Sequence, residues 1–296
     1  MADENVQKEP EVKKKEKKPK PKKERNSSFF LWLLLIIVVW WFNNYALKET
    51  RVEVKSAKVK STLKFAVISD QHATKHGVSN KTIVSAVNSA HPDVVFILGD
   101  MYTSGSKWEL INKPIELAAA ITSAGYPVYV VTGEHDTDKR YISELEKAGA
   151  NVVNYKDTIV NVRGNDLHIM GIDNVYYSDT FDLSNEFELS SDCYNILLAH
   201  IPNYEKFASF GADLTLCGDT HGEMAQLPFG FGPVYHAETQ TWLPKLLDEG
   251  IEIYDKGFFD YDGGTMFITS GIGVYPYPVR FNNRPEIVIM EVKPKG

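Results

Sequence analysis

Residue types that ligate metals recur at the ends of apolar runs, beginning with Asp219 and His221 in the segment CGDTHG at residues 217–222. Side chains two positions apart project to the same side of an extended segment, so Asp219 and His221 could hold one metal ion together. Four other apolar runs end in similar residues, which are Asp70, His72, Asp100, Glu134, His135, Asp136 and His200. Strands of an open α/β sheet place their carboxyl ends at a common crevice. The sequence therefore predicts one polynuclear metal site.

The segments that must position these residues alternate between predicted strands and helices in the first half of the chain. Apolar runs predict three strands, at residues 64–70, 93–100 and 127–132. Helical patterns follow them, at residues 79–90, 114–125 and 138–147. This order is typical of a mostly parallel sheet covered by helices, so the fold class expected is α/β.

The second half of the chain is richer in predicted strands. A hairpin is expected over residues 158–172, because Gly164, Asn165 and Asp166 form a turn between two apolar runs. Further elements are a short helix at 204–210 and strands at 196–200, 214–217, 264–270 and 286–292. The loop at 222–263 is long and rich in aromatic and Gly residues. It is expected to form either a lid or substrate rim, or a plain surface insertion.

The amino end differs in charge from the rest of the chain. Residues 1–26 carry nine Lys, one Arg and six acidic residues, a net charge of +4, so the remainder carries −11 and the whole chain −7. A solvated, disordered, basic tail is expected over residues 1–28. The acidic body argues against nucleic acid as a partner, because phosphate contacts need clustered Lys and Arg.

Fourteen uninterrupted apolar residues follow the tail, at positions 29–42. Continued to Leu47 as a helix, this segment reaches about 28 Å, close to the thickness of a bilayer core. We interpret residues 29–47 as an uncleaved transmembrane signal anchor, with a buried core helix and a cleaved signal peptide as the alternatives. Nine basic residues between positions 11 and 29, against six in a similar stretch after the span, favour a cytoplasmic tail and an extracytoplasmic domain at the cell membrane. Residues 48–62 are expected to be a linker and residues 63–296 the catalytic domain.

Other residues that could do chemistry lie outside this pattern. Cys193 and Cys217 do not make a disulfide framework, and whether they pair is left open. Arg280 could contact a phosphate or form an ordinary salt bridge. Four histidines are expected at the surface, and these are His76, His91, His168 and His236.

The order of the motifs resembles that of the calcineurin-like metallophosphoesterases, whose pattern is Asp-x-His, Gly-Asp, Gly-Asn-His-Asp/Glu, a lone His and Gly-His-x-His. The corresponding segments in this chain are Asp70-Gln71-His72, Gly99-Asp100, Gly133-Glu134-His135-Asp136, His200 and Gly218-Asp219-Thr220-His221. Residues 270–273, 278–281 and 284–287 also resemble the membrane-linked bacterial branch of that family. The resemblance covers nearly all of residues 63–292.

The resemblance implies a four-layer α/β/β/α sandwich with two divalent metal ions, bridged by a carboxylate and a hydroxide. Carried over by position, the first ion is held by Asp70, His72 and His221, and Asp100 bridges both ions. The second ion is held by His200, with Glu134 and Asp219 where the family usually has Asn and His.

The resemblance also implies a hydrolase that cleaves a phosphodiester or pyrophosphate bond by means of the metal-bridged hydroxide. His135 would be the general acid that protonates the leaving oxygen, and Asp136 could orient it. A short tether keeps the site near the bilayer and favours a lipid-linked or envelope substrate. The resemblance to bacterial UDP-diacylglucosamine-type and cell-wall phosphoesterases points the same way. A soluble nucleotide and the oligomeric state are left open.

Three positions depart from the family pattern: Thr103, where an Asp is common, Glu134 and Asp219. Four carboxylates instead of two lower the formal charge of a two-ion site from +2 to 0, which predicts an alkaline-shifted pH optimum. Their oxygen atoms favour Mn²⁺ or Mg²⁺, with Zn²⁺, Fe and Ca²⁺ as alternatives. A weak, partly empty second site is another interpretation. The alternative function is a membrane-tethered metal-binding or interaction protein on a degenerate phosphoesterase fold, without turnover.

Overall fold

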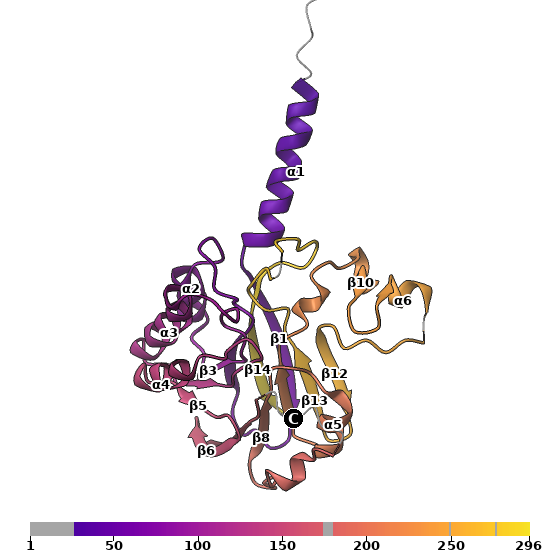
Figure 1. The fold of residues 1–296 in the computed structure, drawn as a ribbon. Coiled ribbons are helices and arrows are strands. Elements are labelled where there is room, and N and C mark those ends of the chain that lie inside the picture. The colour runs from indigo at the N-terminus through magenta and orange to yellow at the C-terminus, as the bar shows by residue number, and fades with distance from the viewer. Residues whose placement is uncertain (1–26, 174–179, 249, 276) are drawn as a thin grey trace, which may run out of the picture. The chain divides into compact units, whose positions relative to one another are not determined.

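The computed structural model describes residues 27–173, 180–248, 250–275 and 277–296 (Figure 1). The chain divides into two units, Met1–Ile37 and Val38–Gly296, and the second contains every described strand. The boundary falls within helix α1, Ser27–Tyr45. Residues 1–26 of the expected basic tail lie outside the described residues.

Helix α1 is apolar around its whole circumference. The side chains of residues 29–42 are all exposed, by 41–66%, so this helix packs into no core of the described structure. The alternative of a buried core helix is therefore wrong. An 18-residue stretch of the helix, Ser28–Tyr45, is long and apolar enough to cross a membrane. An apolar helix without a protein core around it is typical of a membrane span.

Strand β1, Lys48–Ser56, follows helix α1 after only Ala46 and Leu47. It pairs in parallel with strand β14, Glu286–Pro294, over its whole length. The expected linker at 48–62 is therefore wrong for residues 48–56, which form the edge of a sheet. Val52 and Val54 alternate with charged residues in the two-residue period of a strand, and such charges are common on exposed edges.

Two six-stranded sheets form the body of the domain. The first has the order β1-β14-β2-β3-β4-β5, with β2 Leu63–Ile68, β3 Val94–Ile97, β4 Val128–Val130 and β5 Asn151–Val152. Strands β2 to β5 run parallel, and β14 is antiparallel to β2. The second sheet has the order β12-β13-β9-β8-β7-β6. Its strands are β6 Lys156–Val162, β7 Asn165–Gly171, β8 Tyr194–Leu198, β9 Leu214–Cys217, β12 Gly257–Tyr261 and β13 Gly264–Ile268.

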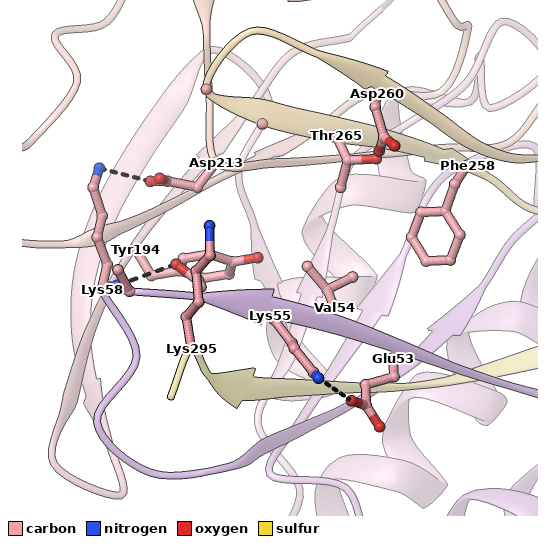
Figure 2. A pocket seen from close by; sticks show the side chains of 14 residues that line it. Glu53, Val54, Lys55, Lys58, Tyr194, Asp213, Phe258, Asp260, Thr265 and Lys295 are labelled. Atoms are coloured by element: carbon pink, nitrogen blue, oxygen red, sulfur yellow. Dashed lines mark hydrogen bonds and ion pairs between the residues drawn. The ribbon is translucent and has the colours of Figure 1, made fainter.

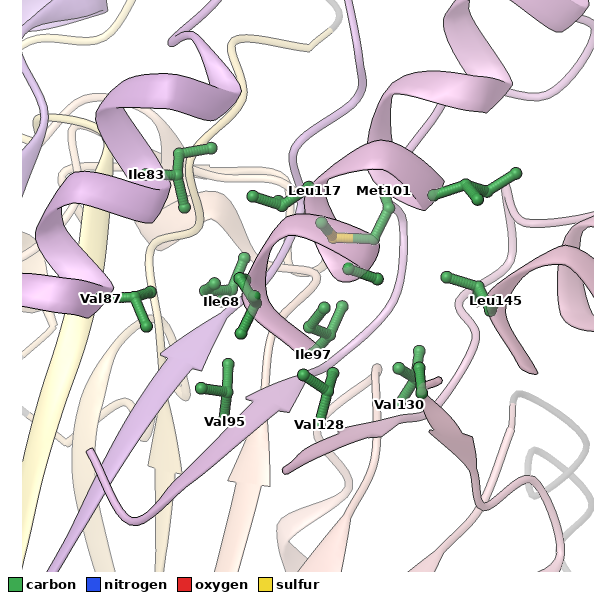
Figure 3. Close-up of a cluster of buried hydrophobic side chains, with 14 of the residues drawn as sticks. Ile68, Ile83, Val87, Val95, Ile97, Met101, Leu117, Val128, Val130 and Leu145 are labelled. Carbon is green, nitrogen blue, oxygen red and sulfur yellow. The ribbon is translucent and has the colours of Figure 1, made fainter. Parts of the chain in front are cut away.

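Helices cover the outer face of each sheet, and a separate apolar core lies between the sheets. The first sheet is covered by α2 Asn80–Ala90, α3 Trp108–Ser123 and α4 Lys139–Lys147. Figure 3 shows Ile83, Leu117 and Leu145 of these helices facing strand residues such as Ile97 and Val130. Helix α5, Tyr204–Phe210, packs on the second sheet. The expected four-layer α/β/β/α sandwich is confirmed.

Helix boundaries agree with the sequence where a capping residue marks them. Ser79 caps α2 and Asp138 caps α4, each by accepting a hydrogen bond from a backbone N–H of the first turn. Helix α3 begins six residues before the predicted start at Pro114, which lies buried inside the helix. The buried side chain of Ile111 extends the apolar face toward the amino end, and this packing outweighs the preference of proline for a first turn.

The long loop expected at 222–263 contains short elements of its own. These include β10 Tyr235–His236, β11 Thr241–Trp242, α6 Pro244–Leu247 and the whole of β12. Strands β10 and β11 form a small antiparallel pair, in which Tyr235 lies opposite Trp242.

Candidate metal centre

The candidate ligands lie just beyond the carboxyl ends of β2, β3, β4, β8 and β9. Backbone hydrogen bonds hold neighbouring ends together: the N–H of Asp70 donates to Gly99 O at 3.0 Å, and that of Gly218 donates to His200 O at 2.9 Å. The N–H of Asp219 lies 3.1 and 3.2 Å from the two carboxylate oxygens of Asp70 and so joins the two sheets. The five strand ends therefore meet at one place.

Close packing explains the glycines that precede several candidate ligands. A Cβ atom on Gly133 would collide with the Asp100 carboxylate, and one on Gly218 would collide with Ser69. Five candidate ligands have positive φ angles of 39–69°, and these are Asp70, His72, Asp100, Asp219 and His221. Strained backbone of this kind costs roughly 1–3 kcal/mol per residue and concentrates at functional sites.

One group of converging atoms comes from Asp70, His72 and His221, whose ligand atoms all lie within 4.8 Å of one another. The Nε2 atoms of His72 and His221 are 3.2 Å apart, and Nε2 of His221 is 3.7 Å from Asp70 Oδ1. The Thr103 hydroxyl lies 3.2 Å from His72 Nδ1. If Nδ1 donates to this hydroxyl, Nε2 keeps a lone pair for a metal ion.

A second group comes from Asp70, Asp100 and His200, and the structure leaves one of its atoms without a partner. His200 Nδ1 donates to Leu98 O at 2.8 Å, which leaves the lone pair on Nε2. Three carboxylate oxygens surround Nε2, from Asp100 at 3.3 Å, Asp219 at 3.6 Å and Asp70 at 3.9 Å. This buried nitrogen forms no hydrogen bond among the described residues. A cation between it and the carboxylates would satisfy all of them, so the residues fit a metal ion.

Asp100 lies between the two groups. Its Oδ2 atom is 3.3 Å from His200 Nε2 and 3.7 Å from His72 Nε2, while Oδ1 accepts the His135 N–H at 2.8 Å. Asp70 also belongs to both groups, although the family pattern assigns it to one ion. Both carboxylates, and not Asp100 alone, are thus placed to contact two metal ions at once.

His135 belongs to a third group, with His72 and Asp100, whose ligand atoms also lie within 4.8 Å of one another. Its Nε2 is 4.0 Å from Asp100 Oδ2 and 3.8 Å from Glu134 Oε1. Its Nδ1 accepts the N–H of Ser104 at 3.2 Å. Because a backbone N–H can only donate, the neutral ring carries its hydrogen on Nε2, on the side of the metal groups. The ring can therefore offer a proton there.

The side chains of Asp136 and Glu134 lie outside the ligand groups found among the described residues. The Asp136 carboxylate is buried and accepts the N–H groups of Met101 and Gly133 at 3.1 and 3.0 Å, so it holds loop backbone instead of the His135 ring. The Glu134 side chain is 51% exposed and belongs to none of the ligand groups found among the described residues. Asp219 is closer to its expected position, beside His200.

Burial and neighbouring charge set the proton affinity of these groups. Burial raises the pKa of Asp70 to about 7 and lowers the pKa of His72 to about 3. Burial also lowers the pKa of His221 well below its usual range. For His200 burial acts in the same direction, but the surrounding carboxylates outweigh it and raise the pKa to about 10. A proton on His200 can therefore balance these buried carboxylates, and a divalent cation bound between them would replace that proton.

Two residues that the motif order did not assign complete the wall of the site. Tyr275 stacks on His72 at 4.5 Å between ring centroids and meets His135 edge-on at 5.0 Å. Arg280 is buried and donates to Ser270 O, Gly273 O and His221 Nδ1, the last at 3.3 Å. A guanidinium can only donate hydrogen bonds, so this contact places the lone pair of His221 on Nδ1 and its hydrogen on Nε2. If Nε2 binds a metal ion, the hydrogen moves to Nδ1 and the contact with Arg280 must lengthen.

Arg280 and Tyr275 could be found from the sequence only in part. Arg280 was a candidate for a phosphate contact or a salt bridge, and the structure instead directs its guanidinium to backbone carbonyls and His221. Tyr275 carries no signal beyond its place after the segment 270–273.

A cleft of about 700 Å³ opens from the metal centre. Glu134 and Asp219 line its inner end, and the loop at 222–263 contributes Glu223, His236 and Tyr254. These residues of the loop therefore form part of the rim of the cleft. The cleft is acidic, since Glu205 and Glu238 also line it.

A second cavity, of about 690 Å³, lies at the opposite ends of strands β8 and β9 (Figure 2). Tyr194 and Asp213 line it near the starts of these strands, and Lys58 forms an ion pair with Asp213 at 2.9 Å. Its lining contains none of the candidate ligands, so the chemistry predicted from the sequence belongs to the other cleft.

The remaining residues singled out in the sequence are placed as follows. Cys193 and Cys217 are both buried and free, so they do not pair in this structure. His168 and His236 are buried, 3% and 4% exposed, so the expectation of a surface position is wrong for both. His168 Nε2 lies 2.7 Å from Asp157, which satisfies the ring inside the sheet.

Comparison with known proteins gives the same family as the motif order. The family model for calcineurin-like phosphoesterases matches residues 63–249. The uncharacterized metallophosphoesterase YkuE of Bacillus subtilis (strain 168) is 24% identical over 238 residues, which are 78% of this chain and 79% of YkuE. The metallophosphoesterase F40B5.2 of Caenorhabditis elegans is 25% identical over 70% of this chain and 43% of its own length.

Two solved structures from Thermus thermophilus are also similar. TT1561 covers 72% of this chain and 91% of its own chain, with 10% identity and a TM-score of 0.45. The sulfate thiohydrolase SoxB covers 71% and 52%, with 12% identity and a TM-score of 0.41. The family model spans well over half of the chain, so this protein belongs to the calcineurin-like phosphoesterase family.

Proposed function

We propose that the chain is a membrane-anchored phosphoesterase that cleaves a phosphodiester or pyrophosphate bond near the bilayer surface. Family membership makes it a metal-dependent phosphoester hydrolase. The observation that carries the metal chemistry is His200 Nε2, a buried nitrogen that faces three carboxylates and forms no hydrogen bond among the described residues. Such an arrangement is costly unless a cation joins it.

The ligand sets follow from the two groups. We assign His72 and His221 to one divalent ion and His200 with Asp219 to the other, with Asp70 and Asp100 between them. Bound ions of this kind supply a hydroxide nucleophile and neutralise charge on phosphorus. Oxygen donors from three aspartates favour Mn²⁺ or Mg²⁺ over softer metals.

His135 is proposed as the proton donor. Its Nε2–H faces the metal groups, because Ser104 holds Nδ1 as an acceptor. From there the proton can pass to the leaving oxygen as the phosphorus–oxygen bond breaks. Asp136 would act as a positioning residue, since it holds the backbone of Gly133, in the His135 loop, and of Met101, which follows Asp100.

Helix α1 is proposed as the single membrane span, with the catalytic domain outside the cytoplasm. The excess of basic residues before the span supports this orientation. Protease added to intact cells should digest or release the domain after Leu47. Protection of the domain until the cells are lysed would reverse the orientation.

Metal analysis of the full-length protein in detergent, with turnover of an aryl phosphodiester across several divalent metals, tests the proposed chemistry. His200→Ala should lose bound metal and turnover together. His76→Ala is the matched control, since His76 is exposed and lies outside the centre, and it should keep both. Metal binding by the wild type without turnover of phosphodiesters or pyrophosphates would favour the alternative, a metal-binding or interaction protein.

A further inference from the structure

Exposed apolar side chains gather in one part of the catalytic domain. Among the described residues after helix α1, ten large apolar side chains are exposed, and eight of them come from three short segments. These eight are exposed by 51–93% and are Phe229, Phe231, Trp242, Leu246, Leu247, Tyr277, Val279 and Phe281. We call them the apolar platform. Exposed apolar side chains that gather into a patch mark an interaction site.

The three segments of the platform are joined by backbone hydrogen bonds. The N–H of Phe281 donates to Met224 O at 3.1 Å, and Phe281 O accepts the N–H of Gln226 at 2.9 Å. Leu227 in turn donates to Gly232 O at 2.8 Å, which closes the turn that carries Phe229 and Phe231. The N–H of Leu243 donates to Val234 O at 2.9 Å and so ties in the segment 242–247. The platform is therefore one connected layer of chain.

The platform is continuous with the last turns of helix α1, residues 38–45. Trp40 Nε1 donates to Pro278 O at 2.8 Å, and Asn44 exchanges two hydrogen bonds with the backbone of Arg280, at 2.8 and 3.2 Å. Arg284 donates to Ala46 O and Leu47 O, both at 2.9 Å. Figure 1 shows a yellow loop beside the base of α1, with β10 and α6 at the same end of the domain. The helix end and the platform thus share one loop.

The same loop forms a wall of the metal centre. Tyr275 stacks on His72, and Arg280 contacts His221, while Tyr277, Val279 and Phe281 turn their side chains to solvent. The β10–β11 pair likewise contributes residues to both the cleft and the platform. His236 lies on the acidic cleft, and Trp242 belongs to the platform. A molecule held at the platform is therefore next to the entrance of the site.

We propose that the apolar platform docks on the lipid bilayer that helix α1 spans, and that the enzyme takes a phosphoester substrate whose apolar tail stays in that bilayer. This inference rests on the proposed membrane anchor and phosphoesterase function. Aromatic side chains at a helix end lie at the membrane–water interface, and Trp40, Trp41 and Tyr45 are at the end of α1. Segments hydrogen-bonded to that end lie at nearly the same depth. With only Ala46 and Leu47 before strand β1, the domain cannot move away.

Docking is tested on the full-length chain in lipid vesicles with an environment-sensitive dye. The dye is attached to Leu247→Cys, and Ile159→Cys is the matched control, because Ile159 is 58% exposed and lies on strand β6, outside the platform. Both native cysteines are buried, which directs labelling to the new thiol. The Leu247 label should shift to the blue and be quenched by spin-labelled lipid, and the Ile159 label should not. An unquenched Leu247 label would overturn the proposal. That result is expected if a protein partner or a second copy of the chain covers this face instead of lipid.

The consequence for the substrate is tested with two phosphodiesters that share an aryl leaving group. One is water-soluble, and the other carries two acyl chains and is embedded in the vesicle. Replacing Phe231, Trp242 and Leu247 by Ser should lower turnover of the embedded ester at least tenfold and leave the soluble ester unchanged. The double variant Ile159→Ser with Phe258→Ser should affect neither. Equal losses on both esters, or none, would overturn the proposal.

Failure of the proposed phosphodiesterase function can be told apart from failure of the bilayer-held substrate. A wild-type protein that cleaves neither ester with any divalent metal contradicts the phosphodiesterase function. In that case the Leu247 label still decides whether the platform docks on lipid. A wild-type protein that cleaves only the soluble ester keeps the enzyme and removes the bilayer-held substrate.

Discussion

The metal centre has a buried side and an open side, made from the same residue types. On the buried side, Asp70, Asp100 and His200 are 0–2% exposed and lie behind the strand ends. On the open side, the side chains of Glu134, Asp219 and His135 are 51%, 32% and 18% exposed, and Glu134 and Asp219 line the acidic cleft. Water can hydrate the charges of the open side but not those of the buried side.

This difference separates two tasks that the sequence pattern presents as one. Buried charges need a permanent counter-charge, so the buried side is suited to hold cations. Partly exposed groups can reach a substrate and exchange protons with it. Mutations on the two sides should therefore fail in different ways, with loss of metal on the buried side and loss of rate on the open side. Asp219 stands at the border, because it is partly exposed and is also proposed as a ligand of the second ion.

The largest effect is expected from Asp100→Asn. Asn keeps the shape of Asp and an oxygen that can accept the His135 N–H, but it removes the negative charge between the two ligand groups. Hydrolysis should fall to the background of the assay, and bound metal should fall with it. Asp192→Asn, at an exposed position, is the control and should change neither quantity. Full metal content in an inactive Asp100→Asn protein would contradict the proposal that Asp100 contacts both ions.

His135→Ala should separate rate from metal content. The metals should stay, because the buried ligands are untouched, and turnover should fall about 10²–10⁴-fold through loss of the general acid. The loss should be smaller for an activated aryl leaving group, which needs little protonation, than for an alkyl leaving group. An equal loss for both leaving groups would contradict the role as proton donor and indicate that His135 ligates a metal.

Strand ends and ligand types could be predicted from the sequence because both are local properties. An apolar run followed by Gly and Asp or His marks where a buried strand stops, and parallel strands stop at the same edge. Strand β1 was missed because its signal is only Val52 and Val54 among charges, and its partner β14 lies at the other end of the chain.

The division between the buried and open sides could not be predicted, because it depends on side-chain directions set by packing. Asp136 and Asp100 look alike in sequence, yet both carboxylate oxygens of Asp136 accept hydrogen bonds from backbone N–H groups. Glu134 follows a strand as the other candidates do, but its side chain turns toward the cleft. Tyr275 reaches His72 from a loop some 200 residues away in sequence, and no local pattern reports such a contact.

Metal affinity should depend on pH through the buried side. Burial raises the pKa of Asp70 to about 7, and its surrounding carboxylates raise the pKa of His200 to about 10. A metal ion must displace these protons, so affinity rises with pH by roughly tenfold per pH unit for each proton displaced. The contribution of Asp70 ends near pH 7, and that of His200 continues to about pH 10. His72 competes little, since burial lowers its pKa to about 3. Titration with Mn²⁺ at pH 6, 7 and 8 measures this slope, and a flat affinity would contradict it.

Asp219→His tests the metal preference at the border between the two sides. Asp219 has a φ of 69°, a conformation that His72 and His221 also adopt in this site, so His is tolerated there. An imidazole in place of a carboxylate should shift preference from Mn²⁺ toward Zn²⁺ or Fe by about tenfold and lower the pH optimum. Identical metal preference and pH profiles in both proteins would contradict the assignment of Asp219 to the second ion. A single bound ion per chain in the wild type would favour a weak second site.

The smallest effect is expected from Glu134→Gln. This variant decides whether Glu134 ligates the second ion, as the family pattern implies, or lines the cleft, as the geometry indicates. The family pattern places Glu134 at the second ion, whereas its half-exposed side chain lies on the cleft, 3.8 Å from His135 Nε2. If the geometry holds, metal content should not change. The lost charge should improve the KM for an anionic phosphodiester by no more than a few fold, because exposed charges interact weakly in water. This gain should shrink at high salt, where exposed charges are screened. A fall in bound metal would instead place Glu134 among the ligands and move the border between the two sides outward.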